Sequence, residues 1–464
     1  MSKLIGTWSF YKKTLMIAIP VMIQNLITNF VALIDNIMVG QVGTEQMSGV
    51  AIVNQLLFVY NLTIFGAISG AGIFCAQFFG KGDIDGVRNT FRFKILTVSV
   101  LTFIGIGVFL VFGDNLINMY LHDAEEGIDL AATFEYAKQY MMIMLVGLIP
   151  FSFEQAYSGT LREGEIAMPP MVAGVVAVVV NTALNYFLIF GIGIFPEMGV
   201  QGAAIATVIS RFIQVAIIIV WTHTHSGKLE FVNGLYRSMR VPGELASRIT
   251  VKGLIPLMSN ECLWSAGVSA LVQSYSLRGI DVVAGLNIAN TVINLFNVMF
   301  IAFGSGVSVV IGQMLGANEL SRAKESAPKL IFFSAMLCVV VGTIMACFSG
   351  VFPLAYNTSD NVRSLASTFI LISAVLMPVH GALHCTYFTL RSGGKTLITF
   401  IFDCGFSWCV SVPLAFCLAN FTDIGIIPLY LCCQCVEALK CIIGLILIKK
   451  GVWLSNIVSD KKEA

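Results

Sequence analysis

The apolar residues of this chain fall in long runs that short polar stretches separate. A helix needs about 20 consecutive, mainly apolar residues to cross a bilayer, because each residue adds only about 1.5 Å to its length. With a window of this size, the runs predict spans near residues 14–39, 50–79, 93–113, 134–158, 168–192, 199–222, 251–277, 282–314, 328–353, 364–389, 396–419 and 425–448. We therefore expect an all-α polytopic membrane protein with twelve transmembrane helices.

The composition identifies the surroundings of the chain as lipid. Hydrophobic residues make up 57% of the 464 residues, charged residues make up 11%, and the mean hydropathy is +0.86. An average soluble chain carries about 25% charged residues, so this chain cannot cover itself in water. No basic patch or nucleic-acid motif occurs in the sequence, and nucleic acid is excluded as a partner.

The twelve cysteines predict neither disulfides nor a metal site. Many lie inside apolar runs, where cysteine behaves as a small buried hydrophobe. The densest group has no paired Cys-x-x-Cys spacing and falls within one apolar run, so packing is a better interpretation than zinc binding. Its members are Cys432, Cys433, Cys435 and Cys441.

Lysine and arginine are distributed unevenly over the stretches between spans. One alternating set of stretches, which includes both chain ends, holds 22 of them, and the opposite set holds only Lys138, Arg278 and Arg363. Cytoplasmic loops near membrane segments collect positive charge. We expect a multi-pass protein of the cell inner (plasma) membrane with both termini in the cytoplasm.

The chain contains an internal repeat. A shift of 236 residues superposes identical residues in one register. Examples are Pro20 on Pro256, Asn54 on Asn290, Asn61 on Asn297, Gln77 on Gln313 and Gly80 on Gly316. Six spans return the chain to its starting side, so the halves face the same way. Parallel repeats favour two lobes around a central cavity, as in transporters; we place the N-lobe at 1–232 and the C-lobe at 233–464.

Ionisable residues at membrane depth cost about 2.5–3.5 kcal/mol each on insertion scales, so each needs a partner or a function. Asp35 shares a polar face of the first span with Asn25, and we favour a cation-coupling role over that of a helix-end residue. Glu261 begins a polar stripe of the seventh span and is the second candidate carboxylate. Asn181 and Asn185 lie one helical turn apart in the fifth span, where neutral amides can coordinate a cation beside a carboxylate.

Further polar residues are candidates for lining the cavity. Asparagines recur at helical spacing in the second and eighth spans; their alternative role is hydrogen bonding between helices, worth about 1 kcal/mol each. Two histidines and a tyrosine share one face of the tenth span, which suits a proton relay better than zinc binding. These cavity candidates are Asn54, Asn61, Asn287, Asn290, Asn294, His380, His384 and Tyr387.

Several segments carry a resemblance to a known family. The run ALIDNIMVGQVGTEQMSGVAI in the first span resembles the first-helix motif of the multidrug and toxic compound extrusion (MATE) transporters, with Asp35 as its aspartate. The segments AQFFGKGD and GQMLGANE, and the segments SGTLREGE and FTLRSGGKT, are similar to the twin loop motifs of that family. The resemblance covers essentially the full length.

The resemblance implies a pair of helical bundles that exports organic cations, drugs and other amphiphiles in exchange for Na⁺ or H⁺, with no other cofactor. Asp35 matches the N-lobe cation aspartate of the family, and Asn181 matches an asparagine associated with it. Asn185 stands where many members have a second acid, Glu261 lies one turn away from its counterpart in some members, and histidines replace an aspartate of the tenth span. The coupling ion therefore stays open.

Other functions fit the sequence less well. A flippase for lipid-linked precursors would need a larger and more basic cavity, whereas only Arg211 and Lys440 are basic at depth. An intramembrane enzyme would need a catalytic constellation, and the spacing of His380, His384 and Glu154 specifies no reaction. We expect a transporter and not an enzyme, with small amphiphilic substrates and the lipid bilayer as its partners, acting as a monomer.

Overall fold

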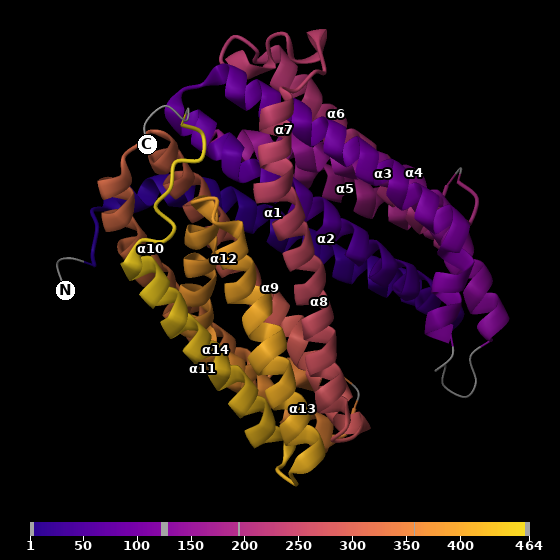
Figure 1. The fold of residues 1–464 in the computed structure, drawn as a ribbon. Helices are drawn as coiled ribbons and strands as arrows, with labels where there is room; N and C mark the ends of the chain where they lie inside the picture. Colours follow the sequence, from indigo (N-terminus) through magenta and orange to yellow (C-terminus); the bar gives the residue numbers. More distant parts are fainter. Residues whose placement is uncertain (1–3, 122–128, 194, 357, 460–464) are drawn as a thin grey trace. The chain divides into compact units, whose positions relative to one another are not determined.

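A computed structural model describes residues 4–121, 129–193, 195–356 and 358–459 (Figure 1). Helices dominate the described residues. Twelve of its elements are long helices or begin one: α1 (Trp8–Gly40), α2 (Thr44–Lys81), α3 (Ile84–Tyr120), α4 (Leu130–Glu163), α5 (Met168–Phe190), α6 (Gly199–Thr224), α8 (Ile255–Ser276), α9 (Ile280–Gly316), α10 (Leu320–Phe348), α11 (Asp360–Ser392), α12 (Thr396–Phe400, continued to Phe421) and α14 (Ile426–Lys450).

The order of these helices reproduces the order of the predicted spans. In the described part of the chain, ten helices are long and apolar enough to cross a membrane. The other two, α1 with 33 residues and α8 with 22, are also long enough at about 1.5 Å per residue. The predicted all-α polytopic fold is therefore confirmed.

Short elements complete the chain. Between α6 and α8 lie η2 (Glu230–Val232), η3 (Leu235–Arg237), α7 (Gly243–Ile249) and the π-helical η4 (Thr250–Leu254), and η5 (Phe352–Ala355) precedes α11. The eleventh span is composite, because α12 leads into two π-helical segments, η6 (Ile401–Gly405) and η7 (Ser407–Ser411), and then into α13 (Val412–Phe421).

Contacts divide the chain into two compact units. The N-terminal unit comprises residues 23–75 and 84–249, and the C-terminal unit comprises residues 1–22, 76–83 and 250–464. The start of α1 and the end of α2 thus belong with the second half of the chain. These units are defined by packing, whereas the halves 1–232 and 233–464 divide a sequence repeat, and that division stays a prediction.

In the N-terminal unit, α3 packs on α4, α4 on α6 and α5 on α6. A buried ion pair joins the first part of α3 to the end of α4: the Nζ of Lys94 lies 2.5 Å from Glu163 and 3.2 Å from the hydroxyl of Thr160. Gly72 of α2 leaves room for Glu163, since a Cβ at this glycine would overlap the carboxylate. The pairing keeps both charges neutralised where water is excluded.

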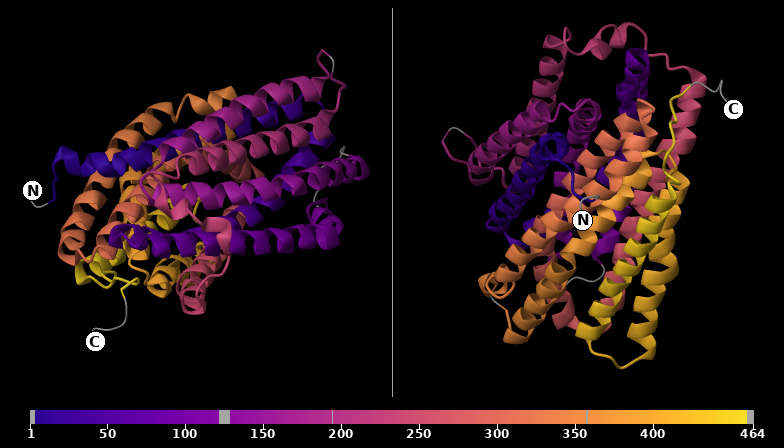
Figure 2. Two further views of the ribbon diagram at one scale, coloured as in Figure 1. Left: turned by 90° about the horizontal axis from the view of Figure 1, so that it is seen from above. Right: turned by 90° about the vertical axis from the view of Figure 1, so that its left-hand side faces the viewer.

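In the C-terminal unit, α11 runs beside α9, α10 and α14 (Figures 1 and 2). The apolar core of the C-terminal unit includes Cys338, Phe369, Met377 and Tyr430. Close helix packing again depends on small residues, because a Cβ on Gly342 would lie 2.5 Å from the carbonyl oxygen of Ala374. Small residues let helix backbones approach each other in membranes, where packing replaces the hydrophobic effect as the driving force.

The ends of α2 and α9 cross in the C-terminal unit at residues that the repeat relates. A Cβ on Gly80 would overlap the backbone carbonyl of Gln313, and a Cβ on Gly316 would overlap the backbone carbonyl of Gln77. Gly80 and Gly316, like Gln77 and Gln313, are the pairs that the shift of 236 residues superposes. The two contacts are therefore equivalent, and both require glycine.

The segment after α14 is fixed to this crossing. The side chain of Gln77 donates from Nε2 to the carbonyl of Ser455 at 3.2 Å and accepts from the N–H of Ile457 at 2.8 Å. Trp453 has 0% of its surface exposed. Residues 451–459 are thus packed against the C-terminal unit, a contact that no sequence pattern indicated.

Both π-helical regions precede a proline inside a span. The segment η4 ends just before Pro256, and η7 ends just before Pro413. A proline has no N–H to donate, and its ring pushes away the carbonyl of the preceding turn, so the helix widens there. The wider turn rotates the side chains that it carries relative to a regular helix.

The equivalent contacts at the α2–α9 crossing generate the first prediction. Gly80→Ala and Gly316→Ala should each lower the free energy of unfolding by about 1–3 kcal/mol, because the added methyl group overlaps backbone that cannot rotate away. Thermal unfolding of the purified protein in detergent measures the effect. Gly107→Ala is the matched control, since a Cβ at this glycine of α3 meets nothing within 4 Å. Equal stability of all three variants would contradict the packing argument.

Candidate functional site

A carboxylate and two amides meet inside the N-terminal unit. The Nδ2 of Asn185 donates to Oδ1 of Asp35 at 2.6 Å, which joins α5 to α1. Asn185 is 1% exposed and Asn181 is 4% exposed. The structure thus brings together three of the four residues predicted for cation coupling, and their role stays a prediction.

Asn181 completes this cluster in one orientation of its amide. With Nδ2 facing Asp35, it donates to Oδ2 at 3.0 Å, and its own oxygen accepts from the hydroxyl of Thr207 at 3.3 Å. This orientation pairs each donor with an acceptor. Thr207 lies on α6, which packs along α5, and no sequence signal singled it out.

The local geometry follows from helical spacing. Asn181 and Asn185 are one turn apart, so both side chains leave the same face of α5. Two amide donors hold the Asp35 carboxylate in this arrangement. The Oδ1 of Asn185 is buried and accepts no hydrogen bond from the described residues. Carboxylate and amide oxygens are the ligands that hard cations prefer.

The remaining polar candidates of the N-terminal unit lie elsewhere. The hydroxyl of Tyr140 donates to Oδ1 of Asn54 at 3.4 Å, and the Oδ1 of Asn61 is buried without a hydrogen-bond partner among the described residues. A separate buried network links Tyr60 to Thr102 at 2.8 Å and to Ser152 at 2.6 Å. Interhelical hydrogen bonding therefore accounts for part of this polar seam.

The second candidate carboxylate, Glu261, lies in a different environment from Asp35. Its Oε1 is 3.9 Å from the guanidinium of Arg391, and the side chains are 12% and 4% exposed. The same guanidinium lies over the rings of Tyr387 at 6.0 Å and Phe388 at 5.6 Å. Glu261 thus faces a cation from its own chain, whereas Asp35 faces amides.

The histidines of the tenth span lie one turn apart on α11. The Nδ1–H of His384 donates to the backbone carbonyl of His380 at 3.0 Å, one turn earlier on α11, and the ring packs on Phe300 with centroids 4.4 Å apart. Among the described residues, no group of three or more His, Cys, Asp or Glu side chains is arranged to hold a metal ion. Each of the twelve cysteines is free.

The asparagines predicted on the eighth span lie along α9. Asn287 and Asn294 are exposed and Asn290 is half-buried in the isolated chain. The backbone carbonyl of Asn287 accepts from the hydroxyl of Thr291 at 3.0 Å. Their contact with a substrate stays a prediction.

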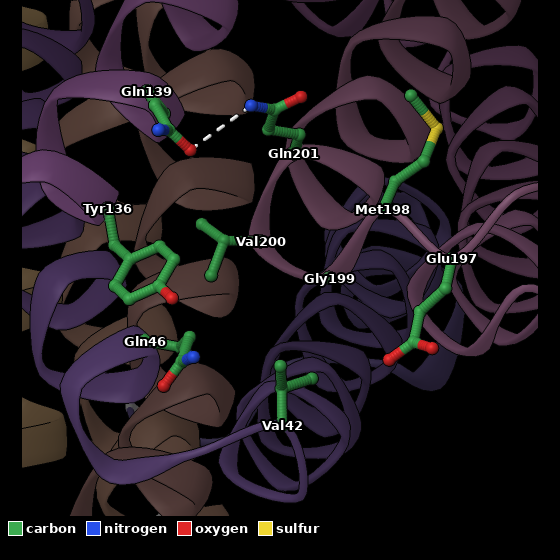
Figure 3. Close-up of a pocket in the computed structure, with 9 residues that line it drawn as sticks. All are labelled: Val42, Gln46, Tyr136, Gln139, Glu197, Met198, Gly199, Val200 and Gln201. Atoms are coloured by element: carbon green, nitrogen blue, oxygen red, sulfur yellow. Dashed lines mark hydrogen bonds between the residues drawn. The ribbon is translucent and has the colours of Figure 1, made fainter. Parts of the chain in front are cut away.

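A cavity of about 260 Å³ lies at one end of the N-terminal unit (Figure 3). The Nε2 of Gln201 donates to Oε1 of Gln139 across it at 3.1 Å. None of the predicted site residues lines it. The lining residues are Val42, Gln46, Tyr136, Gln139, Glu197, Met198, Gly199, Val200 and Gln201.

The structure adds a buried charge cluster that sequence reasoning missed. The Nζ of Lys440 lies 2.6 Å from Oδ1 of Asp403 and 3.7 Å from Oε2 of Glu437. The Nδ2 of Asn260 donates to Oδ2 of Asp403 at 3.0 Å and to the hydroxyl of Tyr387 at 3.2 Å. Lys440, which the sequence placed at membrane depth, is 4% exposed and is paired with these carboxylates. The sequence signal that could have indicated this cluster is the occurrence of Asp403 and Lys440 in consecutive apolar spans.

These features define a class of protein. Apolar helices that cross a membrane many times, a repeat of the chain and ionisable groups buried among the helices are the features of a multi-pass membrane transporter. The sequence matches the MatE family over residues 20–187 and 256–417, and the chain belongs to this family. The resemblance to MATE transporters is confirmed.

Individual relatives match over nearly the whole chain. The Probable multidrug resistance protein NorM of Thermotoga maritima is 25% identical, with 97% of this chain and 95% of that protein covered. The Probable multidrug resistance protein YoeA of Bacillus subtilis is 24% identical, with coverage of 91% and 90%. Both names describe drug resistance for the relatives.

Solved structures share the fold. A crystal structure of MATE in the bent conformation superposes with a TM-score of 0.84 at 18% identity, covering 96% of each chain. An outward-facing multidrug resistance MATE family transporter of the MOP superfamily superposes with a TM-score of 0.83 at 19% identity, covering 97% of this chain and 98% of the other.

The contacts of Asn260 generate the second prediction. Asn260→Leu should lower the free energy of unfolding by about 1–3 kcal/mol, because it leaves buried acceptors on Asp403 and Tyr387 without a donor. Thermal unfolding in detergent measures the loss. The control is Asn420→Leu on the exposed end of α13, where Asn420 bonds only its own turn and the change should stay within about 0.5 kcal/mol. Similar effects of both substitutions would show that the cluster is not stabilised through Asn260.

Proposed function

We propose that this chain is a cation-coupled antiporter that exports small amphiphilic or cationic molecules by alternating access. The observation that carries the proposal is the Asp35 carboxylate, which two amides hold in the interior of the N-terminal unit. Na⁺ or H⁺ is the coupling ion. The drug-resistance names of the relatives support small molecules as substrates.

Neutralisation of Asp35 supplies the coupling. A bare carboxylate in a low dielectric is costly, and a proton or a bound cation removes that cost. A ligand shifts a conformational equilibrium only by its different affinities for the two states. When a proton or cation from one side of the membrane binds Asp35, it would therefore favour one conformation of the transporter. Its release to the other side would favour the other conformation.

The arrangement around Asp35 suits reversible binding. Amides donate to a charged carboxylate but add no charge, so one net negative charge is left for the coupling ion. The oxygen of Asn185 can turn towards a bound cation, since an amide presents either its nitrogen or its oxygen. A flippase for lipid-linked precursors is not favoured, because buried cations of the described chain such as Lys440 and Arg391 face carboxylates.

Removal of the Asp35 charge is the third prediction. Asp35→Asn should abolish gradient-driven efflux of a fluorescent organic cation, because the variant has no charge for the coupling ion to neutralise. Purified protein is reconstituted into vesicles, and efflux is measured first under a Na⁺ gradient and then under a pH gradient. The gradient that drives the wild-type protein identifies the coupling ion.

Asp423→Asn is the matched control, because Asp423 is exposed in the short connection before α14 and should leave efflux unchanged. Asp35→Asn protein must also unfold at a temperature close to that of the wild type, which separates lost coupling from lost folding. Full gradient-driven efflux by the Asp35→Asn variant would remove Asp35 from the mechanism.

The orientation in the membrane is the fourth prediction. We expect the protein to lie in the inner (plasma) membrane with both termini in the cytoplasm. The reason is that 22 of the 27 Lys and Arg residues lie on one alternating set of loops, which includes both chain ends. A fluorescent protein fused to either end should fluoresce, and alkaline phosphatase fused to either end should be inactive. Termini on opposite sides would overturn the parallel repeat.

A further inference from the structure

Lys440 is a buried cation far from either end of its helix. It lies ten residues before the end of α14, or about 15 Å along the axis, and its side chain is 6% exposed. A lysine at this depth in a membrane protein costs about 2.5–3.5 kcal/mol on insertion scales unless it is paired. Its surroundings must therefore supply compensating negative charge.

Carboxylate oxygens from η6 and from α14 itself lie near the Lys440 ammonium. Oδ1 of Asp403 lies at 2.6 Å and Oε2 of Glu437 at 3.7 Å, which places two carboxylates on one cation. The hydroxyl of Ser411 donates to Glu437 at 3.4 Å, and the face of the Phe402 ring lies 5.8 Å from Nζ. Two acids against one lysine leave a net negative charge in this group.

Asn260, on α8, contacts Asp403 of this group. Its Nδ2 donates to Asp403, while its Oδ1 is buried and accepts no hydrogen bond from the described residues. Asp403 and Ser411 both lie on the π-helical stretch of the eleventh span, and π-helical turns occur frequently at functional sites. Two carboxylates that face one ammonium, one of them fixed by an amide and the other by a hydroxyl, provide the oxygen ligands typical of a cation site.

We propose that Asp403, which Asn260 holds in place, and Glu437 form a monovalent-cation site whose occupant is the chain's own Lys440 ammonium. The lysine stem is covalently attached, so its ammonium is present at a high effective concentration and does not dissociate into solution. Free Na⁺ is therefore excluded from this site. The inference goes beyond coupling at Asp35, and a binding measurement tests it without transport.

An ordinary structural ion pair would behave differently when the lysine is removed. If the acids merely balance the lysine, then Lys440→Met leaves a destabilised protein that responds to Na⁺ no more than to other salts. If the acids form a cation site, the same substitution opens it to a small cation. The two interpretations therefore differ in the ion specificity of the variant.

The experiment measures thermal unfolding in detergent with increasing NaCl against choline chloride at equal ionic strength. Every protein carries Asp35→Asn, which removes the other proposed cation site. The added substitutions are Lys440→Met, Lys440→Met with Asp403→Asn, and Lys440→Arg. Lys94→Met is the matched control, because it also removes a buried lysine, but from beside the single carboxylate of Glu163.

We expect Lys440→Met to unfold at a lower temperature in choline and to gain about 2–4 °C in Tm specifically with Na⁺. The double substitution, Lys440→Arg and Lys94→Met should show no Na⁺-specific gain. Equal responses of Lys440→Met to Na⁺ and choline would overturn the proposal. Loss of the gain in the double variant assigns the new site to Asp403.

A further comparison applies if Lys440→Met does not fold. The proposal requires that the Asp35→Asn protein with Lys440 intact has no Na⁺-specific stabilisation that depends on Asp403. The Asp35→Asn protein and its Asp403→Asn derivative should therefore respond identically to Na⁺. A Na⁺-specific gain that Asp403→Asn removes would show that a free cation already occupies the site, which overturns the proposal.

Discussion

The neutralisation of charge in a water-excluding interior is the constraint on which the structure depends. Buried cations in both units lie against carboxylates: Lys94 against Glu163, Lys440 against Asp403. Such pairs are costly to break, because the remaining partner is left as an isolated buried charge. Asp35 is held differently, by amides that donate hydrogen bonds without cancelling its charge. A carboxylate of this kind is the one that a mobile ion can neutralise.

Much of the architecture could be predicted from the sequence, because it rests on long-range averages. The twelve spans follow from the lengths of apolar runs, and the repeat follows from identical residues in one register. The register also has a structural counterpart, since Gly80 and Gly316 make equivalent contacts at the α2–α9 crossing. The family resemblance implied that Asn181 lies beside Asp35, and helical spacing places Asn185 on the same face of α5.

The rest depends on the rotation of individual helices, which hydropathy does not report. Asp403 reaches Lys440 from a π-helical turn, and a regular helix would direct it elsewhere. The spacing of His380 and His384 correctly placed them on one face, but the Nδ1 of His384 is satisfied by its own helix. The attachment of residues 451–459 to Gln77 has no periodic signal at all.

Residues that the repeat relates make different contacts in the two halves of the chain. In the later part of the repeat the shift is 229 residues, which superposes Arg162 on Arg391 and Arg211 on Lys440. The sixth helix of each half thus carries one basic residue, half-buried at Arg211 and buried at Lys440. Arg211 donates to the carbonyl of Gly147 at 3.2 Å and lies 5.2 Å from the ring of Phe151, whereas Lys440 contacts carboxylates. Because the amides around Asp35 add no charge, whereas Asp403 lies against an ammonium of the chain, we assign the exchangeable ion to Asp35 and not to Asp403.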